Sequence, residues 1–171
     1  MDVERDDFGD EPAPDTLKTS AAAKNQSHDR SNWESLGAPG RDTVYGALDL
    51  GTNNCRLLLA RPSRRGFRVI DAFSRIIRLG EGVSGSGRLS DAAIVRAVDA
   101  LRICRAKMHN RGVTRARLIA TEACRAAQNG GEFLERVRSD VGIELEIVDR
   151  ETEATLAATG CTPLVDPTAK G

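Results

Sequence analysis

Histidines and closely spaced cysteines are scarce in this sequence, which limits the metal chemistry open to it. The 171 residues include two histidines and four cysteines, and no two cysteines form a C-x-x-C pair. Structural zinc sites need closely spaced sulfur or nitrogen ligands, and small secreted domains need a dense set of paired cysteines. The sequence therefore argues against a zinc site and against a disulfide framework. We expect Cys55, Cys104, Cys124 and Cys161 to be reduced and mostly buried, as in a cytoplasmic protein.

An excess of one charge, a long apolar run and a signal peptide are also lacking. Lysine and arginine together number 25, as do aspartate and glutamate, so the formal net charge is zero. Nucleic acids and anionic membranes attract proteins with a clustered basic excess. The first residues, MDVERDDFGDEPAP, lack the basic-then-apolar order of a signal peptide, and no apolar run is long enough to cross a bilayer. We expect a soluble cytoplasmic protein with no nucleic-acid or membrane partner.

The first 41 residues differ from the rest in composition. They combine acidic residues, prolines and polar stretches without a sustained hydrophobic period. Such a segment cannot bury enough apolar surface to offset its ordering entropy, so we expect residues 1–41 to form a disordered extension. The chain as a whole is 40% hydrophobic and 29% charged, which allows residues 42–171 to form one packed domain.

Short apolar runs begin at Thr43 and alternate with turn and helix signals. The patterns predict strands at 44–50, 55–60, 67–79, 117–121 and 144–148, and helices between Ser90 and Gly112, at 132–141 and at 150–159. Ser90 and Asp149 are the expected N-caps of the first and third helices. Residues 80–87 hold four glycines and are expected to form a loop. Three strands in a meander, followed by strands alternating with helices, predict a ribonuclease H-like α/β domain with a mixed five-stranded sheet and flanking helices.

The turn between the first two predicted strands carries groups suited to a metal ion and to phosphate. It reads Asp49-Leu50-Gly51-Thr52-Asn53-Asn54. Mg²⁺ prefers one or two carboxylates together with phosphate oxygens, and glycine lets the backbone approach a ligand closely. The amide hydrogens of a tight turn, with threonine and asparagine side chains, can donate to phosphate oxygens. An ordinary hairpin turn rich in turn-forming residues is the alternative interpretation.

The segment from Tyr45 to Ala60 resembles the first phosphate motif of the actin, sugar kinase and Hsp70 superfamily. More narrowly, it is similar to the exopolyphosphatase and guanosine pentaphosphate phosphatase (Ppx/GppA) family, in which the turn reads D-x-G-[ST]-N-[ST]-x-[RH]-L. Three further segments resemble motifs of that family in the same order, at residues 78–90, 119–129 and 147–154. The resemblance covers essentially all of residues 43–171 and implies the first lobe of the family's catalytic domain.

The resemblance implies roles for individual residues in the removal of a terminal phosphate from inorganic polyphosphate or guanosine pentaphosphate. Asp49 would hold Mg²⁺ or another divalent cation. The phosphoryl group would be bound by Gly51, Thr52, Asn53 and Arg125, with help from Arg56. The planar fork of an arginine suits an anion better than the ammonium group of a lysine. An arginine on a strand, such as Arg56, is otherwise commonly paired with a surface carboxylate.

Glu153 aligns with the family's catalytic glutamate, the general base that activates the attacking water. The alternative is that Glu151 and Glu153 are acidic residues in a first helical turn, favoured by the helix dipole. In the family motif I-x-[SG]-x-x-E-E-A, Thr152 replaces the first glutamate, which favours Glu153 as the functional residue. Two other departures are Asn54, where the family has serine or threonine, and Glu122, which adds a negative charge near the proposed phosphate site.

The family's second phosphate loop, D-x-G-G-G-[ST], does not occur in these 171 residues. We therefore expect one lobe of a two-lobed phosphatase, with two interpretations open: an active hydrolase, or a catalytically incomplete fragment that only binds phosphate. Another phosphotransferase of the superfamily is a further alternative, against which the Arg125 and Glu153 motifs argue. A nuclease of the ribonuclease H type would need more acidic residues on the core strands than Asp49. Family members are often homodimers, and the sequence leaves the oligomeric state of this chain open.

Overall fold

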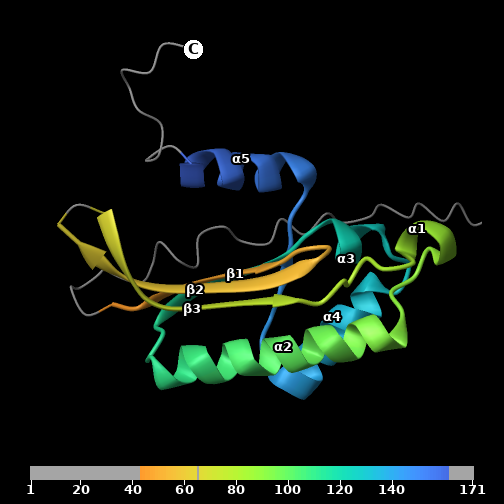
Figure 1. The fold of residues 1–171 in the computed structure, drawn as a ribbon, viewed down its shortest axis with the longest axis horizontal. Helices are drawn as coiled ribbons and strands as arrows, with labels where there is room; N and C mark the ends of the chain where they lie inside the picture. Colours follow the sequence, from red (N-terminus) through yellow and green to blue (C-terminus); the bar gives the residue numbers. More distant parts are fainter. Residues whose placement is uncertain (1–42, 65, 162–171) are drawn as a thin grey trace, which may run out of the picture. The chain divides into compact units, whose positions relative to one another are not determined.

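A computed structural model describes residues 43–64 and 66–161, all of which fall in one compact unit (Figure 1). The extension predicted at residues 1–41 lies outside the described residues. The strands are β1 (Tyr45–Leu50), β2 (Asn54–Ser63), β3 (Gly66–Ile76), β4 (Arg115–Ala120) and β5 (Glu146–Ile147). The helices are α1 (Val83–Ser86), α2 (Asp91–Asn110), α3 (Glu122–Ala126), α4 (Gly130–Val141) and α5 (Arg150–Cys161). None of these helices is long and apolar enough to span a bilayer.

The five strands form one mixed sheet in the order β3-β2-β1-β4-β5. β1, β2 and β3 are antiparallel neighbours, while β4 pairs parallel to β1 and β5 parallel to β4. A short turn is enough to join the antiparallel strands β1 and β2, whereas the parallel pair β1 and β4 needs a long crossover, which includes α2. The predicted ribonuclease H-like α/β fold with a mixed five-stranded sheet is confirmed.

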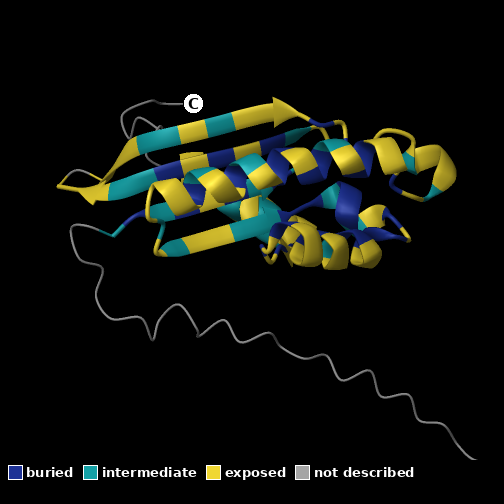
Figure 2. Ribbon diagram, turned by 90° about the horizontal axis from the view of Figure 1, so that it is seen from below, coloured by how far each residue is buried: buried dark blue, intermediate teal, exposed yellow. Residues whose placement is uncertain are grey.

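The hydrophobic core lies between the sheet and the two helices α2 and α4, which cover the same face (Figure 1). Side chains alternate along β1, so Leu48 and Leu50 are buried while Asp49 between them is half-buried on the opposite face. α2 buries a stripe that includes Ile94, Leu101 and Cys104, and its outer side is exposed (Figure 2). Each fully buried leucine contributes about 2 kcal/mol to folding. α5 lies on the side of the second face of the sheet (Figure 1), but none of its residues is buried, and Leu58 on that face is exposed.

Capping residues define the ends of the helices as the sequence predicts. Ser90 Oγ accepts a hydrogen bond from the Ala93 N–H at 3.3 Å, which starts α2. Asp149 Oδ1 accepts from the Thr152 N–H at 2.7 Å and so fixes the start of α5. Gly112, just after α2, has a φ of 62°, a conformation in which only glycine is unstrained.

Strand lengths depart from the prediction at the β2–β3 hairpin. β2 continues to Ser63, past the predicted end at Ala60, because its register with β3 shifts at Leu59/Ala60 and then resumes. β3 ends at Ile76 rather than at Leu79. Ile77 and Leu79 after it remain buried, but the N–H groups of Ile77 and Arg78 bond to the β1–β2 turn instead of to a strand. An apolar pattern alone does not distinguish a buried residue in a strand from a buried residue that follows the strand.

Two short helices were not expected from the sequence. α1 is a single turn inside the glycine-rich segment, with Gly82 and Gly87 in the left-handed region at its two ends. α3 follows β4 directly and packs against the start of α4. The packing is so close that a Cβ on Gly130 would lie 2.0 Å from the Cys124 carbonyl oxygen. Helices of four and five residues have too short a period to be seen in a hydrophobic pattern.

Candidate active site

The β1–β2 turn is held in a fixed conformation by backbone hydrogen bonds. The Gly51 N–H donates to the Asn54 carbonyl at 2.9 Å. Among the described residues, the N–H groups of Thr52 and Asn53 have no acceptor. Two adjacent unpaired N–H groups at the tip of a rigid turn form a ready site for an anion. A Cβ on Gly51 would lie 3.9 Å from Asp49 Oδ1, so glycine keeps the space beside that carboxylate clear.

The segment after β3 braces this turn from outside. The Ile77 and Arg78 N–H groups both donate to the Asn53 carbonyl, at 2.8 and 3.0 Å, and the Gly80 N–H donates to the Thr52 carbonyl at 3.0 Å. Gly80 lies so close to Thr52 that a Cβ there would be 2.3 Å from the threonine methyl group. The turn and residues 77–80 therefore form one bonded unit.

Arg96 of α2 ties the same unit to the helical layer. Its Nε donates to the Ile77 carbonyl at 2.8 Å, and its Nη2 donates to Glu81 Oε2 at 2.9 Å. Between these two contacts lies Arg78, whose φ of 48° makes it the single non-glycine residue with a positive φ in the described chain. Unfavourable backbone conformations persist only where surrounding contacts impose them, and they are common at functional sites. Sequence reasoning assigned no role to Arg96, since its contacts are 15 to 19 positions away along the chain.

Asp49 lies on β1 directly opposite Arg56 of β2 in the strand register. Burial raises the pKa of the Asp49 carboxyl above its ordinary value of 3.8; the positive charge of Arg56 opposes this rise, and the negative charge of Glu153 adds to it. Among the described residues, the Asp49 carboxylate has no hydrogen bond and no ion pair. A partly buried carboxylate beside a second carboxylate is relieved by a cation.

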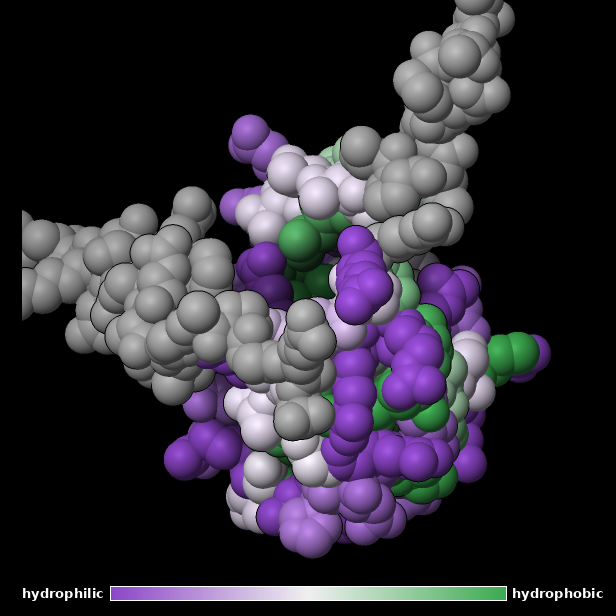
Figure 3. All heavy atoms as spheres, turned by 90° about the vertical axis from the view of Figure 1, so that its left-hand side faces the viewer, coloured by the Kyte–Doolittle hydropathy of each residue, from purple (hydrophilic) through white to green (hydrophobic). Residues whose placement is uncertain are grey.

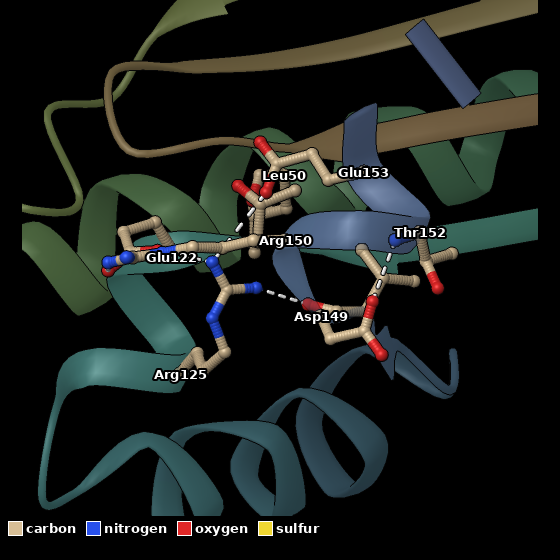
Figure 4. Close-up of polar contacts among 9 residues, drawn as sticks. Leu50, Glu122, Arg125, Asp149, Arg150, Thr152 and Glu153 are labelled. Carbon is tan, nitrogen blue, oxygen red and sulfur yellow. Dashed lines mark hydrogen bonds and ion pairs between the residues drawn. The ribbon is translucent and has the colours of Figure 1, made fainter. Parts of the chain in front are cut away.

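Arg125, on α3, connects three separate parts of the site (Figure 4). Its Nη1 donates to the carbonyl of Val148, and its Nη2 donates to Glu122 Oε2. The same Nη2 lies 3.7 Å from Glu153 Oε2. The side chain of Arg125 is 24% exposed, although both of its Nη atoms contact other groups of the chain.

Glu153 stands in the first turn of α5, where its own N–H donates to the Asp149 carbonyl at 3.0 Å. Its side chain is 43% exposed and faces Arg125 (Figure 4). Glu151, the other acidic residue of that turn, is exposed and makes no ion pair among the described residues. In the first turn of α5, Glu153, and not Glu151, therefore faces Arg125.

Glu122 is enclosed by two arginines. Besides Arg125, its carboxylate accepts from Arg150 Nε at 3.1 Å and from Arg150 Nη2 at 2.8 Å (Figure 4). Arg150, followed by Arg125, lowers the pKa of the Glu122 carboxyl to about 2. The sequence indicated Glu122 as an added negative charge, and it gave no sign of Arg150, 28 positions later, as its partner.

The structure thus brings Asp49, Arg125 and Glu153 together from β1, α3 and α5. Arg56 joins them as the cross-strand neighbour of Asp49, and Thr52 and Asn53 present their N–H groups at the adjoining turn. Within residues 43–64 and 66–161, no group of three or more histidine, cysteine, aspartate or glutamate side chains could hold a metal. The available carboxylates are Asp49 and Glu153, a set that fits a Mg²⁺ ion completed by water and phosphate oxygens.

A cavity of about 500 Å³ extends from the site along the second face of the sheet. Asp49 and Arg56 line its polar end, and Leu58, Ile119 and Leu156 contribute to an otherwise apolar wall. Hydrophobic atoms are visible in the hollow between α5 and the sheet in Figure 3. The three apolar residues come from β2, β4 and α5, so the cavity lies between the sheet and the helix that carries Glu153.

Comparison with known proteins gives one family. The sequence profile of the Ppx/GppA phosphatase family matches residues 59–170. The match begins after the phosphate turn and includes Arg125 and Glu153. A member of the Ppx/GppA family from Aquifex aeolicus is 31% identical in sequence, with a TM-score of 0.66, over 70% of this chain and 39% of its own.

Two further solved structures agree. An exopolyphosphatase-like protein is 31% identical, with a TM-score of 0.68, over 72% of this chain and 38% of its own. An exopolyphosphatase from Cytophaga hutchinsonii is 26% identical, with a TM-score of 0.63, over 67% of this chain and 36% of its own. The chain therefore spans less than two fifths of the length of each of these three relatives.

Proposed function

The chain belongs to the Ppx/GppA phosphatase family, and on that premise we propose that it supplies one wall of an active site that hydrolyses terminal phosphoanhydride bonds. The proposed substrates are inorganic polyphosphate or guanosine pentaphosphate. The observation that carries the proposal is the convergence of Arg125, Glu153 and Asp49 beside the β1–β2 turn. Enzymes that catalyse phosphoryl transfer mainly position the reacting groups and stabilise the negative charge on the transferred phosphoryl group. Arg125, Glu153 and Asp49 can do both.

The β1–β2 turn binds the terminal phosphoryl group in this proposal. The N–H groups of Thr52 and Asn53 have no acceptor among the described residues and donate to phosphate oxygens. Gly51 leaves room beside the Asp49 carboxylate for the group to approach. Because the turn is braced by residues 77–80, its N–H groups are held in place before the substrate arrives, which lowers the cost of organising them.

Arg125 is the proposed phosphate clamp, assisted by Arg56. The Val148 carbonyl fixes its Nη1, and its Nη2 contacts the carboxylates of Glu122 and Glu153. A guanidinium presents two parallel N–H groups that match two phosphate oxygens, which gives both affinity and orientation. Positive charge at this point also stabilises negative charge that accumulates on the transferred group.

Glu153 is the proposed general base. A carboxylate within hydrogen-bonding reach of the attacking water takes up its proton as the new P–O bond forms. Arg125 Nη2, 3.7 Å from Glu153 Oε2, orients the carboxylate. The water attacks the terminal phosphorus in line with the bond to the bridging oxygen, and that oxygen leaves with the shortened chain.

A divalent cation, Mg²⁺ in the first instance, fits the carboxylates of this wall. Asp49 would hold it, with Glu153 nearby, because the Asp49 carboxyl is partly buried and has no hydrogen bond or ion pair among the described residues. When bound, the ion would neutralise charge on the phosphate oxygens. Asp49 would set the position of the cation. Arg56, opposite Asp49 on the neighbouring strand, partly balances the negative charge of its carboxylate.

A second function, phosphate binding without hydrolysis, is favoured for the chain by itself. The chain spans 36 to 39% of the length of the relatives, and the proposed base is 43% exposed. Hydrolysis with a general base needs bulk water to be kept away from the single attacking water, and it needs the leaving group to be held in place. One wall of the site provides neither. We therefore expect the isolated chain to bind a phosphate chain weakly and to release little phosphate.

The experiment uses a chimera in which residues 43–161 replace the matching part of the Aquifex aeolicus relative, so that a complete protein is present. We expect phosphate release from polyphosphate by the chimera. Glu153→Gln should lower this release by about 100-fold or more, and the matched variant Glu151→Gln should change it by less than about twofold. Equal release by the Glu153→Gln variant and the unsubstituted chimera would show that Glu153 is not the base.

A further inference from the structure

We propose that Glu122 competes with phosphate for Arg125, and that Arg150 is a positioning residue that holds Glu122 aside when phosphate is bound. The proposal rests on the proposed function, in which Arg125 is the phosphate clamp. It assigns a role to two residues outside the set that binds phosphate or activates water. It also explains how a site proposed to bind an anion can contain the negative charge of Glu122.

Two donors of Arg125 already have partners within the chain. Its Nη1 is occupied by the Val148 carbonyl, and its Nη2 donates to Glu122 Oε2 while lying 3.7 Å from Glu153. One N–H of Nη1 and one N–H of Nη2 are therefore already bonded within the chain, the second of them to a carboxylate. Phosphate can take this Nη2 N–H only if Glu122 gives up its bond.

The exposure of the side chains indicates whether Arg125 or Glu122 moves when phosphate binds. The Arg125 side chain is 24% exposed and is fixed by the backbone of Val148, which is buried. The Glu122 side chain is 41% exposed, and that of Arg150 is 80% exposed. A more exposed side chain has more rotamers available, so Glu122 and Arg150 can turn outward together while Arg125 stays in place.

Arg150 offers Glu122 an equivalent site when Arg125 is taken. Its Nε and Nη2 bind the two oxygens of Glu122 at 3.1 and 2.8 Å, in the two-pronged geometry that arginine makes with carboxylates. Losing Arg125 thus leaves Glu122 with a complete ion pair. Without Arg150, the carboxylate would have Arg125 as its single cationic partner and would hold it more firmly.

Glu122 keeps its charge in every condition where the site can work. Arg150 and Arg125 lower the pKa of its carboxyl to about 2, so it stays ionised near neutral pH. The other charged groups facing it are those of Arg125, Arg150 and, across Arg125, Glu153. Competition is therefore set by geometry rather than by protonation, and substitution is the direct way to test it.

The test measures binding of sodium tripolyphosphate to the 171-residue chain at fixed pH and ionic strength, by calorimetry and by following the arginine Nε–H signals in NMR spectra. We expect Glu122→Gln to tighten binding and Arg150→Gln to weaken it, each by about three- to fivefold, as ion pairs of this exposure allow. In the Glu122→Gln background, Arg150→Gln should have an effect of less than about 1.5-fold. If Arg150 acts through Glu122, its substitution has little effect once Glu122 is replaced. If Arg150 acts only as a nearby positive charge, the substitution weakens binding equally in both backgrounds.

The matched control is the pair Arg138 and Glu135 on α4, which is also two-pronged and exposed but remote from the site. Arg138→Gln and Glu135→Gln should leave tripolyphosphate binding unchanged. Melting temperatures of all variants identify any loss of folding. If the role of Arg150 is purely structural, Arg150→Gln should lower the melting temperature, and Glu122→Gln should not bind tripolyphosphate more tightly than the unsubstituted chain.

Arg125→Gln separates failure of this inference from failure of the proposed function. If Arg125→Gln binds tripolyphosphate as well as the unsubstituted chain, or if neither binds, Arg125 is not a clamp and both proposals are overturned. If Arg125→Gln weakens binding while Glu122→Gln leaves it unchanged or weaker, the competition alone is overturned. Equal weakening by Arg150→Gln with and without Glu122→Gln also overturns it.

Discussion

Arg125 and Glu153, 28 positions apart in the sequence, meet with Nη2 and Oε2 separated by 3.7 Å. The contact joins α3, which follows β4, to the first turn of α5, which follows β5. Because β4 and β5 are parallel neighbours, their carboxyl ends lie at the same edge of the sheet, and the elements that follow them start side by side. Arg125 and Glu153, the proposed clamp and the proposed base, are thus neighbours as a direct consequence of strand order.

Replacing Arg125 by lysine tests whether the planar fork is needed. Lysine keeps the charge but loses the two parallel donors and the fixed bond to the Val148 carbonyl. We expect tripolyphosphate binding to weaken by about tenfold and stability to fall by about 1 kcal/mol, as Val148 loses its donor. Calorimetry and urea denaturation measure the two effects. Arg138→Lys, an exposed arginine of α4, serves as the control, and an equal loss of binding in both variants would exclude a specific clamp.

The raised pKa of Asp49 predicts a pH-dependent stability difference between Asp49→Asn and the unsubstituted chain. Burial raises the folded-state pKa above 3.8, so ionisation of Asp49 destabilises the fold as pH rises through the raised value, and the full stability is present below 3.8. We expect Asp49→Asn to melt at a higher temperature at pH 7 and at the same temperature at pH 3. Mg²⁺ should raise the melting temperature of the unsubstituted chain more than that of the variant. A lower melting temperature of Asp49→Asn at pH 7 would contradict this account.

Gly80→Ala should disturb the phosphate turn through Thr52. The new Cβ would stand 2.3 Å from the threonine methyl group, so the Thr52 side chain must rotate or Thr52 must shift at the tip of the turn. We expect tripolyphosphate binding to weaken by about fivefold, because small displacements of positioned donors are costly. Gly85→Ala is the matched control in the same glycine-rich segment, since a Cβ there meets no atom within 4 Å. Similar binding by the two variants would show that the turn tolerates the shift.

Gly130→Ala should destabilise the domain, whereas Gly131→Ala should not. A Cβ on Gly130 would lie 2.0 Å from the Cys124 carbonyl oxygen, a backbone atom that cannot move without displacing α3. The expected loss is about 3 kcal/mol in the free energy of unfolding. A Cβ on Gly131 meets nothing within 4 Å, and alanine there should be neutral or stabilising by about 0.5 kcal/mol. Urea denaturation of both variants measures the difference, and equal stabilities would mean that α3 and α4 separate easily.

The sequence was informative where the signal is local. Ser90 and Asp149 act as N-caps as predicted, because a cap is defined by its own residue and the next three. The order of strands and helices followed from hydrophobic periods, and the fold followed from that order. The family resemblance indicated Asp49, Arg125 and Glu153, and the structure brings them together. Their catalytic roles remain predictions.

What the sequence did not reveal depends on contacts between distant positions. Arg150 pairs with Glu122 across 28 positions, and Arg96 reaches Ile77 across 19. Neither arginine stands out from its neighbours by type or spacing. The five-residue helix α3 was missed because it is stabilised by packing on α4 rather than by its own periodicity. These are the features that only tertiary structure can supply.

The bracing of the phosphate turn by Arg96 has a mechanical consequence. Arg96 lies near the start of α2, a helix of 20 residues and therefore about 30 Å long, whose other end is at Asn110. Since Arg96 bonds the Ile77 carbonyl and the Ile77 N–H bonds the Asn53 carbonyl, hydrogen bonds join this helix to the β1–β2 turn. A tilt of α2 against the sheet would therefore stretch the hydrogen bonds that hold the segment carrying the Thr52 and Asn53 N–H groups.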